Sequence, residues 1–459
     1  MIPTGLEPAI LEGEVREVLR TLPDESVHCV VTSPPYWGLR DYGIPPVLWG
    51  GDPSCPHGWE ARLPRRRRSL LDVRDPESSP AGDTGAAVNL PVTKTCSRCG
   101  GWLGQLGLEP DPDLFVEHLA SVFDEVRRVL RSDGTLWLNL GDTYHTDSPI
   151  RASSREAFSR KWDPAQTRGR GGSRRPASRF GEVKPKDLTG IPWRVAFELR
   201  RRGWWLRADC IWAKRNPMPE PIRDRPTRSH EYVFLLTKSP RYFYDAEAVR
   251  EPLQATTLQR LRDHIPNAVD NPAYRSKHSR GDFRRFPMLA NTDPKGRNLR
   301  SVWSIATQPY RGAHFATFPE ALPGVCIGAG TSEKGACVEC GTPWVRRVRS
   351  EGGGIGHDWH PDKSLKLGRA QGIAAPGIHD GTYRRVDLGF HQACSCPTLD
   401  VLPCVVLDPF MGSGTVLAVA HRLRRRSLGI DLNLDSAVLA KDRISASVAS
   451  STQTVEVAT

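Results

Sequence analysis

The sequence predicts an α/β protein whose central sheet is mainly parallel and covered by helices on both faces. Short apolar segments rich in β-branched residues alternate along the chain with longer segments of helical periodicity. Two predicted strands run into tight turns, at residues 33–36 and 408–415, which contain prolines or glycines. Ligands of such sheets bind at the carboxyl ends of the strands. Both turns are therefore candidate sites.

The predicted elements follow one another along the chain. The first is a buried strand over 27–32, which is rich in valine and is followed by two prolines. A helix over 113–130 has its apolar residues on one face, and Asp133-Gly134 is expected to end it. The elements expected after it are a strand over 135–140, a helix over 187–202, strands over 204–212, 231–237 and 404–407, a helix over 415–424, a strand over 428–431 and a helix over 434–447.

Four segments lack this periodicity. Residues 51–101 are poor in apolar side chains and are interpreted as an inserted loop, and the Arg-, Ser- and Gly-rich residues 146–182 as a solvated loop. Residues 245–312 are rich in Arg and Asn, and the Gly-rich residues 350–390 predict no element.

Composition restricts the class of protein. The 459 residues carry a formal net charge of +12, which favours a polyanionic partner, although an arginine-rich surface without such a ligand fits equally. Mean hydropathy is -0.45, and no segment approaches the ~20 apolar residues of a membrane helix. The N-terminus has no signal-peptide pattern, so a cytoplasmic location is expected. In a reducing compartment, eleven cysteines indicate metal sites or buried thiols.

The turn near the C-terminal end has the features of a cofactor loop. Residues 405–415 read as a strand, a glycine turn and a helix start, without the lysine of a phosphate loop. A zwitterion such as the methionine end of S-adenosylmethionine fits better, because helix amides can hold its carboxylate and Asp408 can face its ammonium. Asp431 ends the next strand, where an acidic side chain can accept hydrogen bonds from ribose hydroxyls.

The turn near the N-terminal end has the features of a site for a planar amine. Thr32-Ser33-Pro34-Pro35-Tyr36 closes the first strand. The Ser33 hydroxyl and the Pro34 carbonyl could accept both hydrogens of an exocyclic amine and localise its lone pair. Tyr36 offers an aromatic face for a base removed from the stack. Taken alone, the same residues also fit a diproline strand end with a packing tyrosine.

Together, these residues resemble a known family. The Ser-Pro-Pro-Tyr motif at 33–36 precedes the Asp-Pro-Phe-x-Gly-x-Gly motif at 408–414, the permuted order of the β-class amino-methyltransferases of DNA. The motif over residues 32–42 is similar to that of phage and actinobacterial members. Further similar segments are 186–193, 212–219, 230–237 and 314–319, whereas roughly 60–94, 146–182 and 350–390 fall outside the likeness.

The resemblance implies a Rossmann-like S-adenosylmethionine-dependent methyltransferase sheet with permuted motif order and zinc-stapled insertions. It implies site-specific methylation of duplex DNA by base flipping, and a serine at position 33 favours N4 of cytosine over N6 of adenine. Glu14 replaces the aspartate that the family usually has there, and it remains a weak candidate for cofactor contact. The implied catalytic residues are Ser33, Pro34, Pro35 and Tyr36, and the implied cofactor residues are Thr32, Phe318, Pro319, Asp408, Pro409, Phe410, Gly412, Gly414, Thr415, Asp431 and Asn433.

The same resemblance divides the chain. A catalytic half over 1–244, with insertions at 51–101 and 146–182, is expected to precede a target-recognition region over 245–312. A cofactor-binding half over 313–449, with an insertion at 335–400, and a disordered tail over 450–459 complete the chain. The basic segments 62–68 and 151–179 are candidates for phosphate contacts or mobile basic loops. No nuclease motif is evident, so a restriction endonuclease would be a separate protein, and the sequence does not indicate an oligomeric state.

Two sets of cysteines are spaced for tetrahedral zinc. The first is Cys55, His57, Cys96 and Cys99, and the second is Cys337, Cys340, Cys394 and Cys396. Both would be structural and would stabilise loops without a core of their own. Cys29, Cys210, Cys326 and Cys404 are expected to be buried. Pro403-Cys404 resembles the nucleophile of C5-cytosine methyltransferases, but it opens the strand that leads to the cofactor loop, so we reject that role.

Three alternatives to N4-cytosine methylation remain open. The nearest is N6-adenine methylation of DNA, and the second is methylation of RNA. The third is a zinc-bearing DNA-binding protein with a degenerate active site, against which the intact motifs at 33–36 and 408–415 argue.

Overall fold

The computed structural model describes residues 2–38, 44–61, 94–145, 183–184, 186–259, 296–308, 317–351, 384–433 and 436–445. The chain divides into two compact units. The first contains Met1–Tyr242, Val302–Gly324 and Val405–Thr459, and the second contains Phe243–Ser301 and Val325–Cys404. Among the helices of the described residues, none is long and apolar enough to cross a membrane.

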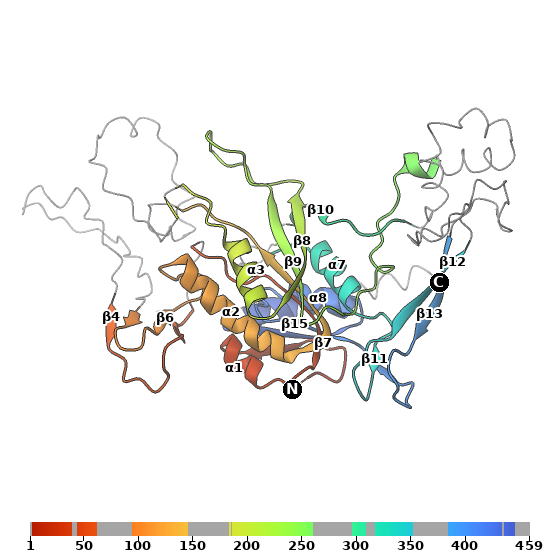
Figure 1. Ribbon diagram of the computed structural model, residues 1–459, viewed down its shortest axis with the longest axis horizontal. Coiled ribbons are helices and arrows are strands. Elements are labelled where there is room, and N and C mark those ends of the chain that lie inside the picture. Colours follow the sequence, from red (N-terminus) through yellow and green to blue (C-terminus); the bar gives the residue numbers. More distant parts are fainter. Residues whose placement is uncertain are drawn as a thin grey trace, which may run out of the picture. The chain divides into compact units, whose positions relative to one another are not determined.

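The first unit is built on an eight-stranded sheet (Figure 1). Its strands run parallel from one edge as far as β7, and the pair at the other edge, β10 and β8, is also parallel; of the eight, only β9 is antiparallel to both its neighbours. The expected mainly parallel α/β sheet is therefore confirmed. In spatial order the strands are β1 (Ala9–Glu12), β16 (Arg426–Asp431), β15 (Val405–Asp408), β2 (Val27–Thr32), β7 (Leu130–Leu140), β9 (His230–Thr237), β8 (Trp205–Lys214) and β10 (Val302–Ile305).

The core of this unit lies between the sheet and its helices. Every residue of β2 is buried, as expected for a central strand of a parallel sheet. Helix α2 (Pro112–Val129) buries the predicted apolar face, and the Asp111 carboxylate caps it by accepting from the amides of Asp113 and Leu114. Other helices are α1 (Val15–Arg20), α3 (Ile191–Arg201), α8 (Thr415–Arg422) and the helical residues 436–445.

Two predicted boundaries are wrong. Asp133-Gly134 does not end α2, because α2 stops at Val129 and β7 begins at Leu130. Gly134 instead allows β2 and β7 to approach closely, since a Cβ there would lie 2.9 Å from the His28 carbonyl oxygen. Helix α3 begins at Ile191 and not at 187, because Pro192 stands in its first turn and the Asp142 carboxylate accepts from the amides of Gly190 and Ile191.

The segment 51–101 is only partly the loop that its composition indicated. Two strands within it, β4 (Trp59–Ala61) and β5 (Lys94–Cys96), join two strands that flank it, β3 (Val47–Trp49) and β6 (Trp102–Gly104). Together they form a four-stranded antiparallel sheet in the order β3-β6-β5-β4. Trp49 and Trp102 are buried and both stack on His118 of α2. These two tryptophans supply the apolar burial that the polar surroundings concealed in the sequence.

The second unit contains two antiparallel strand pairs. β11 (Ala336–Cys337) pairs with β14 (Val401–Leu402), and β12 (Val345–Glu351) pairs with β13 (Arg384–His391). The two ends of the Gly-rich segment 350–390 are therefore strands, which the sequence did not predict. Arg346 lies over the Phe390 ring, and its guanidinium pairs with three carboxylates, those of Asp245, Glu333 and Asp387. Helix α7 (Ala321–Gly330) precedes β11 in the chain.

Candidate active site

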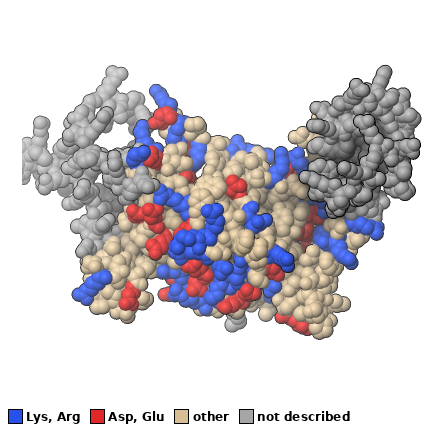
Figure 2. All heavy atoms as spheres, in the orientation of Figure 1, with Lys and Arg blue, Asp and Glu red and all other residues tan. Residues whose placement is uncertain are grey.

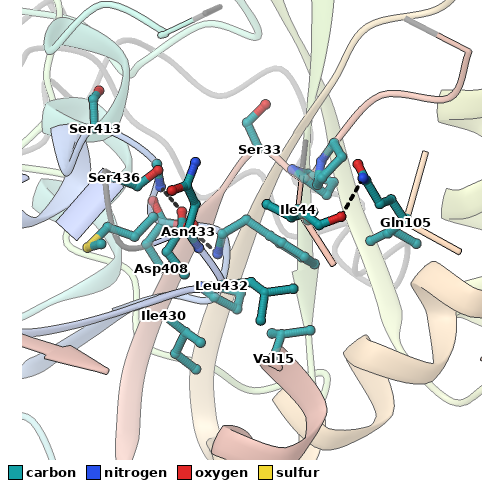
Figure 3. A pocket seen from close by; sticks show the side chains of 18 of the residues that line it. Val15, Ser33, Ile44, Gln105, Asp408, Ser413, Ile430, Leu432, Asn433 and Ser436 are labelled. Carbon is teal, nitrogen blue, oxygen red and sulfur yellow. Dashed lines mark hydrogen bonds between the residues drawn. The ribbon is translucent and has the colours of Figure 1, made fainter. Parts of the chain in front are cut away.

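Both predicted turns open into one cavity of about 800 Å³ at the carboxyl ends of the parallel strands. The pairing of β15 with β2 places Leu407 opposite Val30, so the two strands end at the same edge of the sheet. Ser33 lies on one side of the cavity, and Asp408, Asn433 and Ser436 lie on the other (Figure 3). The two motifs, far apart in the sequence, thus face the same space.

The cofactor side of the cavity is acidic. Asp408 is buried at the end of β15, where it accepts from the Thr32 hydroxyl (2.7 Å) and from the Phe410 amide (3.1 Å). Burial raises the pKa of Asp408 to about 7, against the opposing effect of these hydrogen bonds. Asp431 accepts from the amides of Gly412 and Asn433, both at 2.8 Å. The site thus presents one carboxylate that can pair with an ammonium and a second at the end of the next strand.

Most of the predicted cofactor residues line this cavity. The lining includes Phe318, Asp408, Pro409, Phe410, Gly412, Thr415, Asp431 and Asn433, and also Glu14. Thr32, Pro319 and Gly414 are not part of the lining that the described residues form. Thr32 acts behind it, on Asp408, and Gly414 is the N-cap of α8. Glu14 is also the N-cap of α1, where it accepts from the Glu17 amide and pairs with Arg16.

The four predicted catalytic residues also line the cavity, and a hydrogen-bond network holds two of them. The Ser33 hydroxyl donates to the Tyr36 hydroxyl at 3.2 Å, and Tyr36 donates to the Glu231 carboxylate at 2.7 Å. The Asn139 amide donates to Tyr36 and Glu231 at 2.8 and 2.9 Å. The Ser33 oxygen also accepts from the Asn139 amide at 3.4 Å, so with its hydrogen directed to Tyr36 it keeps one lone pair for a further donor.

Glu231 is charged although it is largely buried. Burial raises its pKa, but the Lys214 ammonium at 2.5 Å and the hydrogen bonds from Tyr36 and Asn139 outweigh this effect, and the net pKa is lowered. The motif therefore rests on a partly buried ion pair between Lys214 and Glu231. Arg228 also lines the cavity, and its buried Nη1 has no hydrogen-bond partner among the described residues.

Asn139, Lys214 and Glu231 did not emerge as site residues from the sequence. Lys214 ends β8, and Glu231 stands near the start of β9. Because β9 is antiparallel, its start lies at the edge where the parallel strands end, so a rule based on carboxyl ends overlooks it. The available signal in the sequence was that charged residues, Lys214 and Glu231, stand at the two ends of the connection between β8 and β9.

Each predicted cysteine set comes together. The potential ligand atoms of Cys55, His57, Cys96 and Cys99 all lie within 4.8 Å of one another, and so do those of the second set, Cys337, Cys340, Cys394 and Cys396. The Cys55 and Cys96 sulfurs are 3.9 Å apart, close to the ~3.8 Å expected for two thiolates on tetrahedral zinc. Both Cys-x-x-Cys-Gly segments form the same turn, in which the glycine amide donates to the first cysteine carbonyl at 2.9 Å.

The other four cysteines are buried as expected. Cys404 is among them, and its thiol donates to the Ser332 carbonyl, so its place in the structure agrees with the rejection of a nucleophilic role. The basic segments 62–68 and 151–179, most of 245–312, and the tail 450–459 lie outside the described residues.

Comparison with known proteins shows which family this chain belongs to. A model of the N6/N4 DNA methylase family matches residues 27–338 and 404–442. The type II methyltransferase M.SmaI of Serratia marcescens is 32% identical over 95% of this chain and 90% of its own length. M.XycI of Xanthomonas campestris pv. cyanopsidis is 32% identical over the same shares. M.Cfr9I of Citrobacter freundii is 32% identical over 96% of this chain and 89% of its own.

Proposed function

Because this chain belongs to the N6/N4 DNA methylase family and is a DNA methyltransferase, we propose that it methylates the exocyclic N4 amine of cytosine in duplex DNA. The observation that carries the proposal is the single cavity into which Ser33–Tyr36, the turn after Asp408, and Asp431 all face. A methyl donor and an amine acceptor must meet at one point for direct transfer, and this cavity provides that point.

On the cofactor side, Asp408 would face the ammonium of S-adenosylmethionine and Asp431 its ribose hydroxyls. When bound, the cofactor supplies a methyl group already activated on a sulfonium. The residues of this chain therefore need only to bind, orient and exclude water, and no covalent protein nucleophile is required.

On the acceptor side, the Ser33 oxygen and the Pro34 carbonyl would accept the two hydrogens of the amine. This arrangement favours a pyramidal nitrogen whose lone pair points at the methyl group. Tyr36 would contact the face of a base flipped from the duplex, in an orientation fixed by its hydrogen bond to Glu231.

The choice of cytosine over adenine rests on Ser33, since an aspartate at this position favours adenine in the family. Nucleoside analysis of DNA methylated in vitro tests it, and N4-methylcytosine is expected. If only N6-methyladenine is found, the cytosine assignment is wrong but the amino-methyltransferase mechanism stands. Competition between duplex DNA and RNA in the same assay tests the polymer, and DNA is expected to be the preferred substrate.

We further propose that both cysteine clusters bind structural zinc. The donor types and the clustering of ligand atoms within 4.8 Å support it, as does the shared turn geometry. Metal analysis of the purified protein is expected to find two zinc ions per chain, one for each cluster. Protein that retains no zinc after purification without chelators would contradict this.

The relatives are named type II methyltransferases, and we propose that this chain likewise protects DNA against a separate endonuclease. Methylation-sensitive sequencing of DNA from a host that expresses the protein identifies the methylated sites. That DNA should resist cleavage at these sites by an endonuclease of the same specificity. Cleavage at fully methylated sites by every endonuclease of the matching specificity would argue for a solitary role.

A further inference from the structure

The small sheet β3-β6-β5-β4 forms part of the wall of the active-site cavity. Val47 and Trp49 of β3 line the cavity, and so do Gly104, Gln105 and Leu106 at the end of β6. The Gln105 side chain donates to the Ile44 carbonyl at 2.6 Å, which closes this wall (Figure 3). A displacement of the strands of this sheet would therefore change the shape of the cavity.

The cluster Cys55, His57, Cys96 and Cys99 is formed by this sheet and the segments next to its strands, since Cys55 and His57 come just before β4. Cys96 belongs to β5, and Cys99 stands in the turn between β5 and β6. The Cys96 amide donates to the Gly101 carbonyl at 2.7 Å, immediately before β6 begins. Each strand has only three residues, so the sheet has few hydrogen bonds of its own. A metal ion would fix the turn from which β6 starts.

The loop that follows β6 packs directly behind the catalytic motif. The Gly38 amide donates to the Gly107 carbonyl at 2.8 Å, and the Trp37 indole donates to the Glu109 carbonyl at 3.0 Å. A Cβ at position 107 would lie 3.1 Å from the Tyr36 carbonyl oxygen. Glu109 in turn is buried, and its carboxylate holds the Gly107 amide at 2.8 Å and His118 at 3.1 Å.

We propose that the metal ion held by Cys55, His57, Cys96 and Cys99 positions the catalytic motif, through β6 and the loop 105–109. The inference rests on the proposed zinc site and assigns it a task in methyl transfer. Without the metal, the turn at 96–101 is no longer held in one conformation, and β6 and the loop 105–109 become more mobile. Ser33–Tyr36 then lose the packing that holds them in position. Because small displacements of reacting groups are costly, turnover at saturating substrates is expected to fall about 10- to 100-fold.

The test compares Cys99→Ser with Cys340→Ser in the full-length protein. Cys340 belongs to the second cluster, and the strands next to that cluster, β11 and β14, contribute no residue to the cavity lining as the described residues define it, whereas β3 and β6 do. Each variant is expected to retain one zinc ion fewer than the wild type. Hydrogen exchange measured on peptides covering 33–38 and 102–109 should accelerate in Cys99→Ser only, and turnover should fall in that variant only.

Gly107→Ala tests the contact between the loop 105–109 and the catalytic motif without removing a metal ligand. Its added Cβ would press on the Tyr36 backbone, so turnover should fall although zinc content stays at the wild-type value. The proposal is overturned if Cys99→Ser loses its zinc yet keeps wild-type exchange at 33–38 and wild-type turnover. Equal losses in Cys99→Ser and Cys340→Ser would also overturn it, because they would indicate general destabilisation. Exchange and zinc content report on the coupling even if the methylation assay itself fails, so the two failures can be told apart.

Discussion

At the scale of single residues, we propose that the Ser33 hydroxyl accepts a hydrogen bond from the amine that is methylated. Its hydrogen goes to Tyr36 and its oxygen accepts from the Asn139 amide, which leaves one lone pair to accept from the amine. Ser33→Ala should therefore lower the rate of methyl transfer by about 10-fold or more, whereas S-adenosylmethionine affinity should stay close to the wild-type value. Single-turnover kinetics and isothermal titration measure the two effects separately. Tyr36→Ala should behave similarly, and unchanged turnover in that variant would refute its contact with the base.

The charge of Glu231 is the second prediction at this scale. Glu231→Gln keeps the shape of the side chain but leaves Lys214 without its ionic partner and weakens the acceptor for Tyr36. The rate of methyl transfer should fall about 10-fold without loss of cofactor binding. Glu198→Gln is the matched control, because Glu198 also has a pKa lowered by hydrogen bonds to arginines but lies outside the cavity lining. A wild-type rate in Glu231→Gln would contradict a positioning role.

Asp408 is the proposed partner of the cofactor ammonium, and we therefore predict that cofactor binding depends on pH. Its pKa is raised to about 7, so the carboxylate is largely ionised above that pH and protonated below it. A cation binds the ionised form, so affinity for S-adenosylmethionine should approach its full value about one unit above pH 7 and should fall up to about tenfold per unit below pH 7. Titration calorimetry between about pH 5.5 and pH 8.5 measures this. Asp408→Asn should bind more weakly and lose the dependence, and a flat profile in the wild type would count against the assignment.

At the scale of elements, the strands and helices around the two motifs could be predicted because their apolar pattern is strong. Strand β2 is buried along its whole length and matches its predicted bounds, and α2 shows a clear amphipathic face. The edge strands β1 and β10 were missed, because four residues with partial burial leave no period to detect. The small sheet was missed for a different reason, since its order depends on contacts with α2 and on cysteines distant in sequence.

The start of α8 provides a test of the cofactor loop as an element. Gly414 has a φ of 72°, and a Cβ there would lie 2.6 Å from the Ala440 Cβ. Gly414→Ala should therefore destabilise the loop by about 1–3 kcal/mol and weaken cofactor binding. Gly324→Ala, in α7, is the control, because a Cβ there meets nothing within 4 Å. Thermal unfolding and titration calorimetry distinguish the two variants, and equal cofactor affinity in both would contradict the prediction.

At the scale of the whole molecule, the cavity depends on residues from both ends of the chain. The sequence could predict that Ser33–Tyr36 follows one strand and that Asp408 and Asp431 end two others, and the resemblance to a family implied that they form one site. It could not predict the supporting network, because Asn139, Lys214 and Glu231 come from three strands whose order in the sheet is not readable from a single sequence. Tertiary pairing, rather than local pattern, determines which polar residues meet.

The last prediction concerns how the distribution of basic residues contributes to the binding of DNA. The net charge is +12, yet on the face drawn in Figure 2 lysines and arginines lie among aspartates and glutamates. Residues 151–179 contain eight arginines and one lysine against one glutamate and one aspartate, so this segment is expected to bind many of the DNA phosphates.

Replacing Arg170, Arg174 and Arg175 by glutamine should weaken binding to duplex DNA and flatten its dependence on salt. For each phosphate that the protein no longer neutralises, the slope of log affinity against log salt becomes shallower by about 0.9. The control replaces the exposed Arg20, Arg200 and Arg201 by glutamine, which changes the net charge equally but on helices α1 and α3. Fluorescence anisotropy across a salt series measures both sets. If the two triple variants show the same slope, the segment 151–179 acts only through net charge, whereas a shallower slope for the first set alone assigns it direct binding to the phosphates.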